Sequence, residues 1–135
     1  MRLFLDTANL THIRHGVELG IISGVTTNPS LVSKEGKVDY KALVKEICSV
    51  VPGPVSTEVL SQEAAGMVAE AHEIVTWAEN IAVKIPATLD GFKATAILAR
   101  ENIKVNVTLC FSLNQAMLAA NAGAAFISPF VGRLD

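Results

Sequence analysis

Polar residues stand at the ends of six short apolar runs, 20 to 30 positions apart along the chain. These residues are Asp6, Asn28, Glu58, Lys84, Thr108 and Ser128. Lys84 lies between Val83 and Ile85 in such a run, where a buried cationic lysine would be costly. Desolvation favours the neutral amine, which is a nucleophile toward a carbonyl carbon. Lys84 is therefore a candidate Schiff-base lysine, and a structural ion pair with Glu58 or Asp6 is the alternative interpretation.

Two carboxylates could supply the proton transfers that Schiff-base chemistry requires. A proton must be delivered to expel water from the carbinolamine, and a base must accept the proton of the β-hydroxyl when the C–C bond breaks. Glu58 and Asp6 are the candidates for these steps, and Thr108 could hold a catalytic water. Asp6 could instead cap the helix expected to begin at Leu10, because aspartate is favoured at helix N-termini.

Amide and guanidinium groups suit a phosphorylated sugar. Asn28 and Asn106 offer donors and acceptors for sugar hydroxyls, although turns and strand ends use asparagine in the same way. Thr26 is a weaker candidate ligand because threonine is common in strands. Arg133 is a candidate phosphate ligand, since a guanidinium can bind phosphate through two hydrogen bonds, and a solvated arginine is the ordinary alternative.

The elements that must position these side chains alternate between short strands and longer helices. The expected strands are residues 2–6, 23–27, 55–59, 81–85, 104–109 and 125–128. The expected helices are residues 10–19, 40–50, 62–78, 91–99 and 113–122, with Ser61 and Ser112 as N-caps. Strands that alternate with helices in this way predict βαβ units and a parallel sheet.

Two architectures satisfy this alternation, an open doubly wound sheet and a (β/α)8 barrel. Length favours the open sheet, because a whole barrel typically has about 200 residues or more. The pattern within strands favours the barrel, since one face is apolar (Val105, Val107 and Leu109) and the other is polar (Asn106 and Thr108). We predict a single α/β domain over residues 1–135, which is a partial TIM barrel with about the first six βα units. The other units would belong to a longer parent protein or to another chain.

Composition narrows the choice of partners. Half of the 135 residues are hydrophobic and the formal net charge is -2. Nucleic acid and membrane partners are not expected, because no basic patch or long apolar stretch is evident. Cys48 and Cys110 fit no disulfide framework, which predicts buried free thiols in a reducing cytoplasm. The three histidines do not cluster at metal-ligand spacing and no nucleotide-binding motif is present, so neither a metal nor a cofactor is expected.

Six motifs, in order along the chain, resemble the strand-end motifs of the small transaldolases and fructose-6-phosphate aldolases. They are LFLDTAN (3–9), GVTTNPSL (24–31), VSTEV (55–59), VKIP (83–86), NVTLCFS (106–112) and SPFVGR (128–133). The resemblance implies a (β/α)8 barrel and class I aldol chemistry without a metal. It implies that Lys84 forms the Schiff base, that Asp6 is the acid–base group near the C4 hydroxyl, and that Glu58 and Thr108 hold the catalytic water.

The resemblance also implies a set of substrate ligands. Asn28, Asn106 and Ser128 are expected to bind the dihydroxyacetone portion, and Arg133 the phosphate. Thr26 and Phe130, which lie in the same motifs, are added to these. The full set of expected substrate ligands is Thr26, Asn28, Asn106, Ser128, Phe130 and Arg133. The expected partners are sugar phosphates and other copies of the chain, because the family assembles into ring-shaped oligomers, typically decamers.

Two positions distinguish the branches of this family. The aldolase branch carries Gln in place of Glu58 and Tyr in place of Phe130, so this chain resembles the transaldolase branch. The expected reaction, a step of the pentose phosphate pathway, moves a dihydroxyacetone unit from sedoheptulose 7-phosphate to glyceraldehyde 3-phosphate, or runs in reverse. The alternatives are a fructose-6-phosphate aldolase, an inactive fragment of such an enzyme, and a phospho-receiver-like signalling domain. The signalling domain would need an acidic pair after the first strand and an Asp on the third, whereas only Asp6 and Glu58 are present there, which argues against it.

Overall fold

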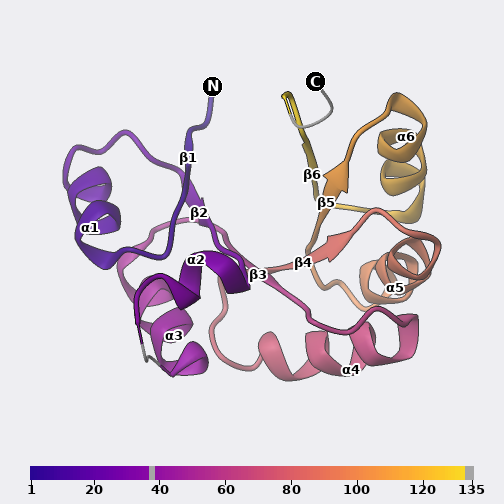
Figure 1. Cartoon of the computed structure of the whole chain (residues 1–135), viewed down its shortest axis with the longest axis horizontal. Helices are drawn as coiled ribbons and strands as arrows, with labels where there is room; N and C mark the ends of the chain where they lie inside the picture. Colours follow the sequence, from indigo (N-terminus) through magenta and orange to yellow (C-terminus); the bar gives the residue numbers. More distant parts are fainter. Residues whose placement is uncertain (37–38, 133–135) are drawn as a thin grey trace. The chain divides into compact units, whose positions relative to one another are not determined.

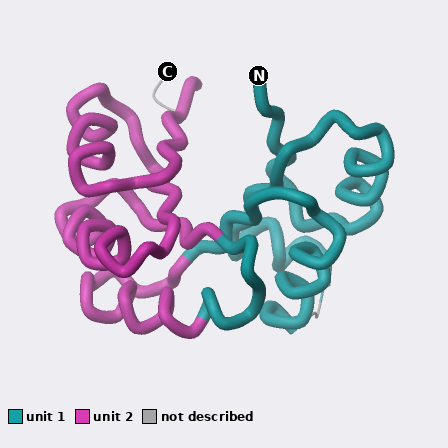
Figure 2. Tube along the Cα trace, turned by 180° about the vertical axis from the view of Figure 1, so that it is seen from behind, with its two compact units in different colours: residues 1–58, 74–81 teal, residues 59–73, 82–135 magenta. Residues whose placement is uncertain are grey.

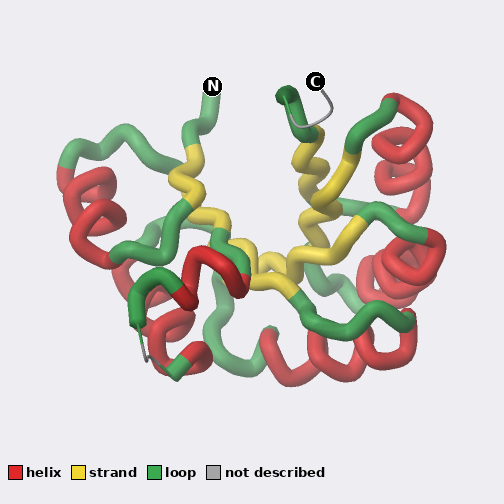
Figure 3. Tube along the Cα trace, viewed as in Figure 1, coloured by secondary structure: helices red, strands yellow, loops and turns green. Residues whose placement is uncertain are grey.

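Strands and helices alternate along the chain, as Figure 1 and Figure 3 show. The computed structural model describes residues 1–36 and 39–132. The strands in these ranges are β1 (Phe4–Asp6), β2 (Gly24–Thr26), β3 (Val55–Glu58), β4 (Ile81–Pro86), β5 (Val105–Cys110) and β6 (Phe126–Pro129). The helices are α1 (Leu10–Glu18), α2 (Pro29–Ser33), α3 (Tyr40–Val50), α4 (Ala64–Ile74), α5 (Leu89–Arg100) and α6 (Leu113–Ala122). None of these helices has the length and apolar character needed to cross a membrane.

The predicted elements are confirmed, with differences at their ends. Each predicted strand is present and its ends lie within two residues of the prediction, while α3 and α6 have the predicted bounds. Ser112 is the N-cap of α6, as predicted. The prediction that Ser61 caps a helix was wrong. The helix begins only at Ala64, and the Ser61 hydroxyl accepts a hydrogen bond from the Glu63 amide ahead of it, at 3.3 Å.

One helix, α2, was not predicted. It has five residues, too few for a clear apolar period. Its start nevertheless has a local explanation: the Asn28 side chain accepts from the Leu31 amide at 2.8 Å. Pro29 follows at the first helical position, where its missing N–H is not needed.

The chain packs as two compact units, which Figure 2 distinguishes by colour. The first comprises residues 1–58 and 74–81, and the second the described residues of 59–73 and 82–135. In the first unit β1, β2 and β3 pair in parallel, with Leu5 opposite Val25 and Val25 opposite Val55. Val25, Val55, Ile13 of α1 and Ile47 of α3 are fully buried there.

In the second unit β4, β5 and β6 also pair in parallel. Val83 lies opposite Val105, and Val107 lies opposite Ile127. Val83, Val105, Val107 and Leu98 of α5 are fully buried. Burying each of these side chains stabilises the fold by about 1.5–3 kcal/mol, so this core fixes the strands that carry the polar residues.

Strand order follows the sequence, which decides between the two predicted architectures. Within the first unit the Val55 amide donates to the Asn80 carbonyl at 2.9 Å, and within the second the Val59 amide donates to the Lys84 carbonyl at 3.2 Å. These bonds agree with a sheet in which β4 comes next after β3. In a doubly wound sheet, by contrast, the order of the strands across the sheet reverses at a switch point. The chain therefore contains six βα units of a (β/α)8 barrel. That they form a single domain stays a prediction.

Candidate active site

Asp6 and Thr26 form the polar end of the first unit's strands. They are register partners on β1 and β2, and the Thr26 hydroxyl donates to the Asp6 carboxylate at 2.9 Å. The alternative role of Asp6 as a helix cap is not realised, because Asn9 caps α1 by accepting from the His12 amide at 3.0 Å. Thr26 therefore orients the carboxylate that was predicted to act as acid and base.

Glu58 and Asn28 end the other two strands of this unit. Glu58 ends β3 and is half-buried. It lies two residues beyond Ser56, the register partner of Thr26, and so shares the face that carries Thr26. Asn28 follows β2 and uses its carbonyl oxygen to cap α2. This is the strand-end role foreseen as the alternative for Asn28, and it leaves the side-chain amide nitrogen without a described partner.

Lys84 lies on the polar face of the second unit. Its exposed fraction is 8%, and its neighbours Val83 and Ile85 are fully buried. Asn106, which is 3% exposed, is its register partner on β5. The Ser128 hydroxyl donates to the Asn106 side-chain oxygen at 2.8 Å. The structure thus brings together Lys84, Asn106 and Ser128 on three neighbouring strands.

Thr108 stands where β5 becomes irregular. It is buried and lies opposite Pro86, and its carbonyl accepts from the Ala87 amide at 2.8 Å. The register between β5 and β6 then shifts by one residue between Val107 and Cys110, which makes a β-bulge. Thr108 therefore occupies the last regular position before the bulge.

Leu109 is the residue that the bulge displaces. Its φ is +54°, in the left-handed region, and its exposed fraction is 39%. The prediction that Leu109 continues the buried apolar face of Val105 and Val107 was wrong, because the extra residue breaks the alternation. A left-handed leucine costs about 1–2 kcal/mol, which the surrounding contacts must offset.

Phe130 lies just beyond β6. It is half-buried, its ring meets that of Phe111 edge-on with centroids 5.0 Å apart, and its amide donates to the Cys110 carbonyl at 2.9 Å. Arg133, the predicted phosphate ligand, lies outside the described residues.

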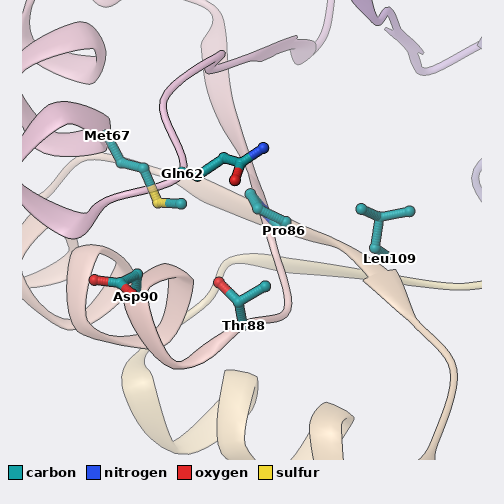
Figure 4. A pocket seen from close by; sticks show the side chains of 6 residues that line it. All are labelled: Gln62, Met67, Pro86, Thr88, Asp90 and Leu109. Carbon is teal, nitrogen blue, oxygen red and sulfur yellow. The ribbon is translucent and has the colours of Figure 1, made fainter.

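A cavity of about 290 Å³ lies in the second unit, lined in part by residues at the end of β4 and at the β5 bulge. Figure 4 shows the side chains that line it. Its lining residues are Gln62, Met67, Pro86, Thr88, Asp90 and Leu109. Sequence patterns did not indicate this cavity. Asp90 also accepts a hydrogen bond from the Ala64 amide at 3.1 Å, 26 positions away, and no local pattern encodes such a contact.

Several residues that hold the strand-end loops were also missed. The Glu70 carboxylate accepts from the amides of Leu60 and Ser61, both at 2.7 Å, in the loop after β3. Gln115 contacts the loops after β4 and β5. The one available signal was that Gln115 follows the cap Ser112 by three positions, the spacing of a capping box.

The two cysteines and the possible metal ligands among the described residues also bear on the predictions. Cys48 and Cys110 are free and buried, as predicted. Burial raises the pKa of the Cys48 thiol from 9.0 to about 11. Within residues 1–36 and 39–132, no group of three or more His, Cys, Asp or Glu side chains could hold a metal ion.

Parallel βα units in sequence order, with a buried lysine on an inner strand position, define a (β/α)8-barrel protein with its polar groups at the strand ends. A family model described as Transaldolase/Fructose-6-phosphate aldolase matches residues 3–135. The chain belongs to this family.

Curated relatives support the same assignment. The chain is 56% identical over 136 residues to a probable transaldolase of Dehalococcoides mccartyi. It is 59% identical over 135 residues to one of Methanococcus maripaludis, and 57% identical over 135 residues to one of Pelotomaculum thermopropionicum. These alignments cover 100% of this chain but only 62–63% of the relatives, so the chain spans less than two thirds of their length.

Proposed function

We propose that this chain is part of a transaldolase that transfers a dihydroxyacetone unit between sugar phosphates through a Schiff base on Lys84. The observation that carries the proposal is the placement of Lys84: a lysine that is 8% exposed, within a fully apolar strand run, and in register with Asn106. The amine of a lysine is the nucleophile that forms a Schiff base with a ketone.

On this proposal Lys84 attacks C2 of the donor ketose, and the carbinolamine loses water to give an iminium ion. Asp6 takes the proton of the C4 hydroxyl, the C3–C4 bond breaks, and an aldehyde leaves. The electron pair stays as an enamine on the dihydroxyacetone unit. The enamine then attacks the acceptor aldehyde to form a new C3–C4 bond, and Asp6 returns its proton to the new C4 hydroxyl. Hydrolysis of the iminium ion by the water that Glu58 and Thr108 hold releases the new ketose and the free lysine.

The proposed substrate ligands bind different parts of the sugar phosphate. Asn106 and Ser128, already joined by a 2.8 Å hydrogen bond, bind the hydroxyls of the dihydroxyacetone portion together with the Asn28 amide. Arg133 binds the phosphate. Thr26 acts through its hydrogen bond to Asp6, and the Phe130 ring bounds the acceptor side. We also propose that the protein works in the cytoplasm as a homo-oligomer.

Reductive trapping tests the proposal directly. Borohydride added to the chain with fructose 6-phosphate should reduce the imine, add mass to the peptide that contains Lys84, and leave Lys84→Met unlabelled. Lys93, exposed on α5, provides the matched control, and Lys93→Met should be labelled like wild type. Labelling of Lys84→Met at another lysine would refute the assignment of the nucleophile.

Two further outcomes separate the alternatives. Release of free dihydroxyacetone without an acceptor aldehyde would indicate the aldolase activity. Glu58 and Phe130 favour the transferase, because both match the transaldolase branch. A folded chain that is not labelled at all would indicate an inactive portion of the enzyme.

A further inference from the structure

Gln115 on α6 contacts two loops that follow the strands of Lys84 and Thr108. Its side-chain oxygen accepts from the Phe111 amide at 2.8 Å, in the loop after β5. Its side-chain nitrogen donates to the Ala87 carbonyl at 3.1 Å, in the loop after β4. Ala87 and Phe111 each lie three residues beyond Lys84 and Thr108, so one amide group joins the two strand ends.

This arrangement departs from an ordinary capping box. Ser112 caps α6 by accepting from the Gln115 amide at 3.2 Å, and in a capping box the Gln115 side chain would accept from the Ser112 amide in return. It accepts one residue earlier instead, from Phe111, and its nitrogen reaches Ala87. An ionised carboxylate could accept from Phe111 but could not donate to Ala87, so near neutral pH the pair of contacts requires an amide.

The two loops enclose the β5 bulge. Leu109 is held at a φ of +54°, and a conformation of that cost persists only where surrounding contacts fix it. Three contacts surround it: the Ala87 amide on the Thr108 carbonyl, the Phe130 amide on the Cys110 carbonyl, and the Gln115 amide between the loops. Of these, Gln115 alone joins β4's loop to the residues after the bulge through a side chain.

We infer that Gln115 is a positioning residue, which holds the β5 bulge in place and thereby fixes Thr108 relative to Lys84. This inference rests on the proposed function, in which Thr108 holds the water that enters and leaves the Schiff base. Displacement of a reacting group by about 1 Å lowers a rate by about 100-fold, so release of the bulge should affect the chemical step. Half-saturation should change little, because the described hydrogen bonds of the Gln115 side chain reach Phe111, Ser112 and Ala87, none of which is a proposed sugar ligand.

Two variants and a control test the inference on this chain. The Gln115 side-chain oxygen also accepts from the Ser112 hydroxyl at 3.3 Å. Gln115→Met keeps the length of the side chain and loses all three side-chain bonds, whereas Gln115→Glu keeps the two in which the oxygen accepts, from the Phe111 amide and the Ser112 hydroxyl. Asn114→Met, one position earlier and exposed, is the matched control. We expect Gln115→Met to exchange the amide hydrogens of Phe111 and Ala87 at least 10-fold faster, with those of Val83 and Val107 unchanged. We expect Asn114→Met to match wild type.

The rate of trapping and the half-saturation concentration distinguish a positioning role from a purely structural one. A purely structural role would not lower the rate while leaving half-saturation unchanged. Gln115→Met should trap fructose 6-phosphate on Lys84 about 10 to 100 times more slowly, with half-saturation within about twofold of wild type. In Gln115→Glu a protonated carboxyl can donate to the Ala87 carbonyl, so its rate relative to wild type should rise severalfold between pH 7 and pH 5. A relative rate that stays constant with pH would count against the inference.

The two proposals fail in distinguishable ways. If wild type is trapped and Gln115→Met is trapped at the same rate with unchanged exchange at Ala87 and Phe111, the inference is overturned and the proposed function stands. If folded wild type is not trapped, this chain by itself is an inactive portion of the enzyme, and the exchange rates alone decide whether Gln115 holds the bulge. Should Gln115→Met fail to fold, Gln115→Glu provides the same comparisons.

Discussion

Replacing Asn80 by alanine should destabilise the chain through three backbone contacts. Its side-chain nitrogen donates to the carbonyls of Cys48 and Val51, both at 3.2 Å, and to that of Gly53 at 2.9 Å. Asn80 directly precedes β4, and its own carbonyl accepts from the Val55 amide at 2.9 Å. It therefore fixes the point at which the strand of Lys84 begins.

The magnitude follows from the donors that are lost. One amide nitrogen has two N–H groups, and each net hydrogen bond contributes about 1 kcal/mol, so Asn80→Ala should cost about 2 kcal/mol. At about 2.1 cal/mol/K per residue, the unfolding entropy of 135 residues is about 0.28 kcal/mol/K. The melting temperature should then fall by about 7 °C. Asn80→Asp should fall further, because a carboxylate would face three carbonyl oxygens.

Circular dichroism melting measures both changes. Asn114→Ala is the control, since Asn114 is an exposed helical asparagine and alanine is favoured in helices. Its melting temperature should stay within about 2 °C of wild type. An Asn80→Ala chain that melts as wild type does would refute the view that these contacts anchor residues 74–81 to the first unit.

Three further perturbations have definite expected outcomes. Gly91→Ala would place a Cβ in steric conflict with the backbone carbonyl oxygen of Pro86, and urea unfolding should show a loss of about 3 kcal/mol. The Cys48 thiol, whose pKa burial raises from 9.0 to about 11, contributes stability that is complete below pH 9 and is lost as pH rises to 11. Wild type should therefore lose about 1.4 kcal/mol more than Cys48→Ala between pH 8 and pH 10, and parallel pH profiles would contradict this. The buried Thr57 hydroxyl has no hydrogen-bond partner among residues 1–36 and 39–132. Thr57→Val should therefore raise the free energy of unfolding by about 1 kcal/mol, whereas a loss would reveal a partner.

Most of the fold was predictable because local patterns and tertiary packing agree. β4 reads as a run of apolar residues interrupted by one lysine, and the structure buries that run around Lys84. Ser112 marks the start of α6 in the sequence and caps that helix in the structure. Asp39 caps α3 in the structure, although it was not predicted as a cap from the sequence. The predicted helix over residues 62–78 was too long, because its last residues turn away into the segment that Asn80 anchors.

The candidate site was predictable only as far as strand periodicity extends. A period of two places Lys84 and Asn106 on one face, and the register confirms that they are partners. The same period wrongly placed Leu109 with Val107, because a bulge inserts a residue that no composition signal marks. The contact between Gln115 and Ala87 spans 28 positions, and side-chain contacts of that kind arise from the packing of whole elements.

Along β4 and β5, apolar core residues alternate with residues of the polar face. Substitutions on these two faces should therefore have different effects. Val83, Val105 and Val107 determine core volume, while Lys84 and Asn106 face the other way. A combinatorial library restricted to Asn106 and Thr108 would vary the polar groups and leave Val83, Val105 and Val107 in place. The bulge at Leu109 marks where that independence ends, because a change there alters backbone and side-chain direction together. Directed evolution of new substrate preferences should therefore tolerate substitutions before the bulge more readily than at it.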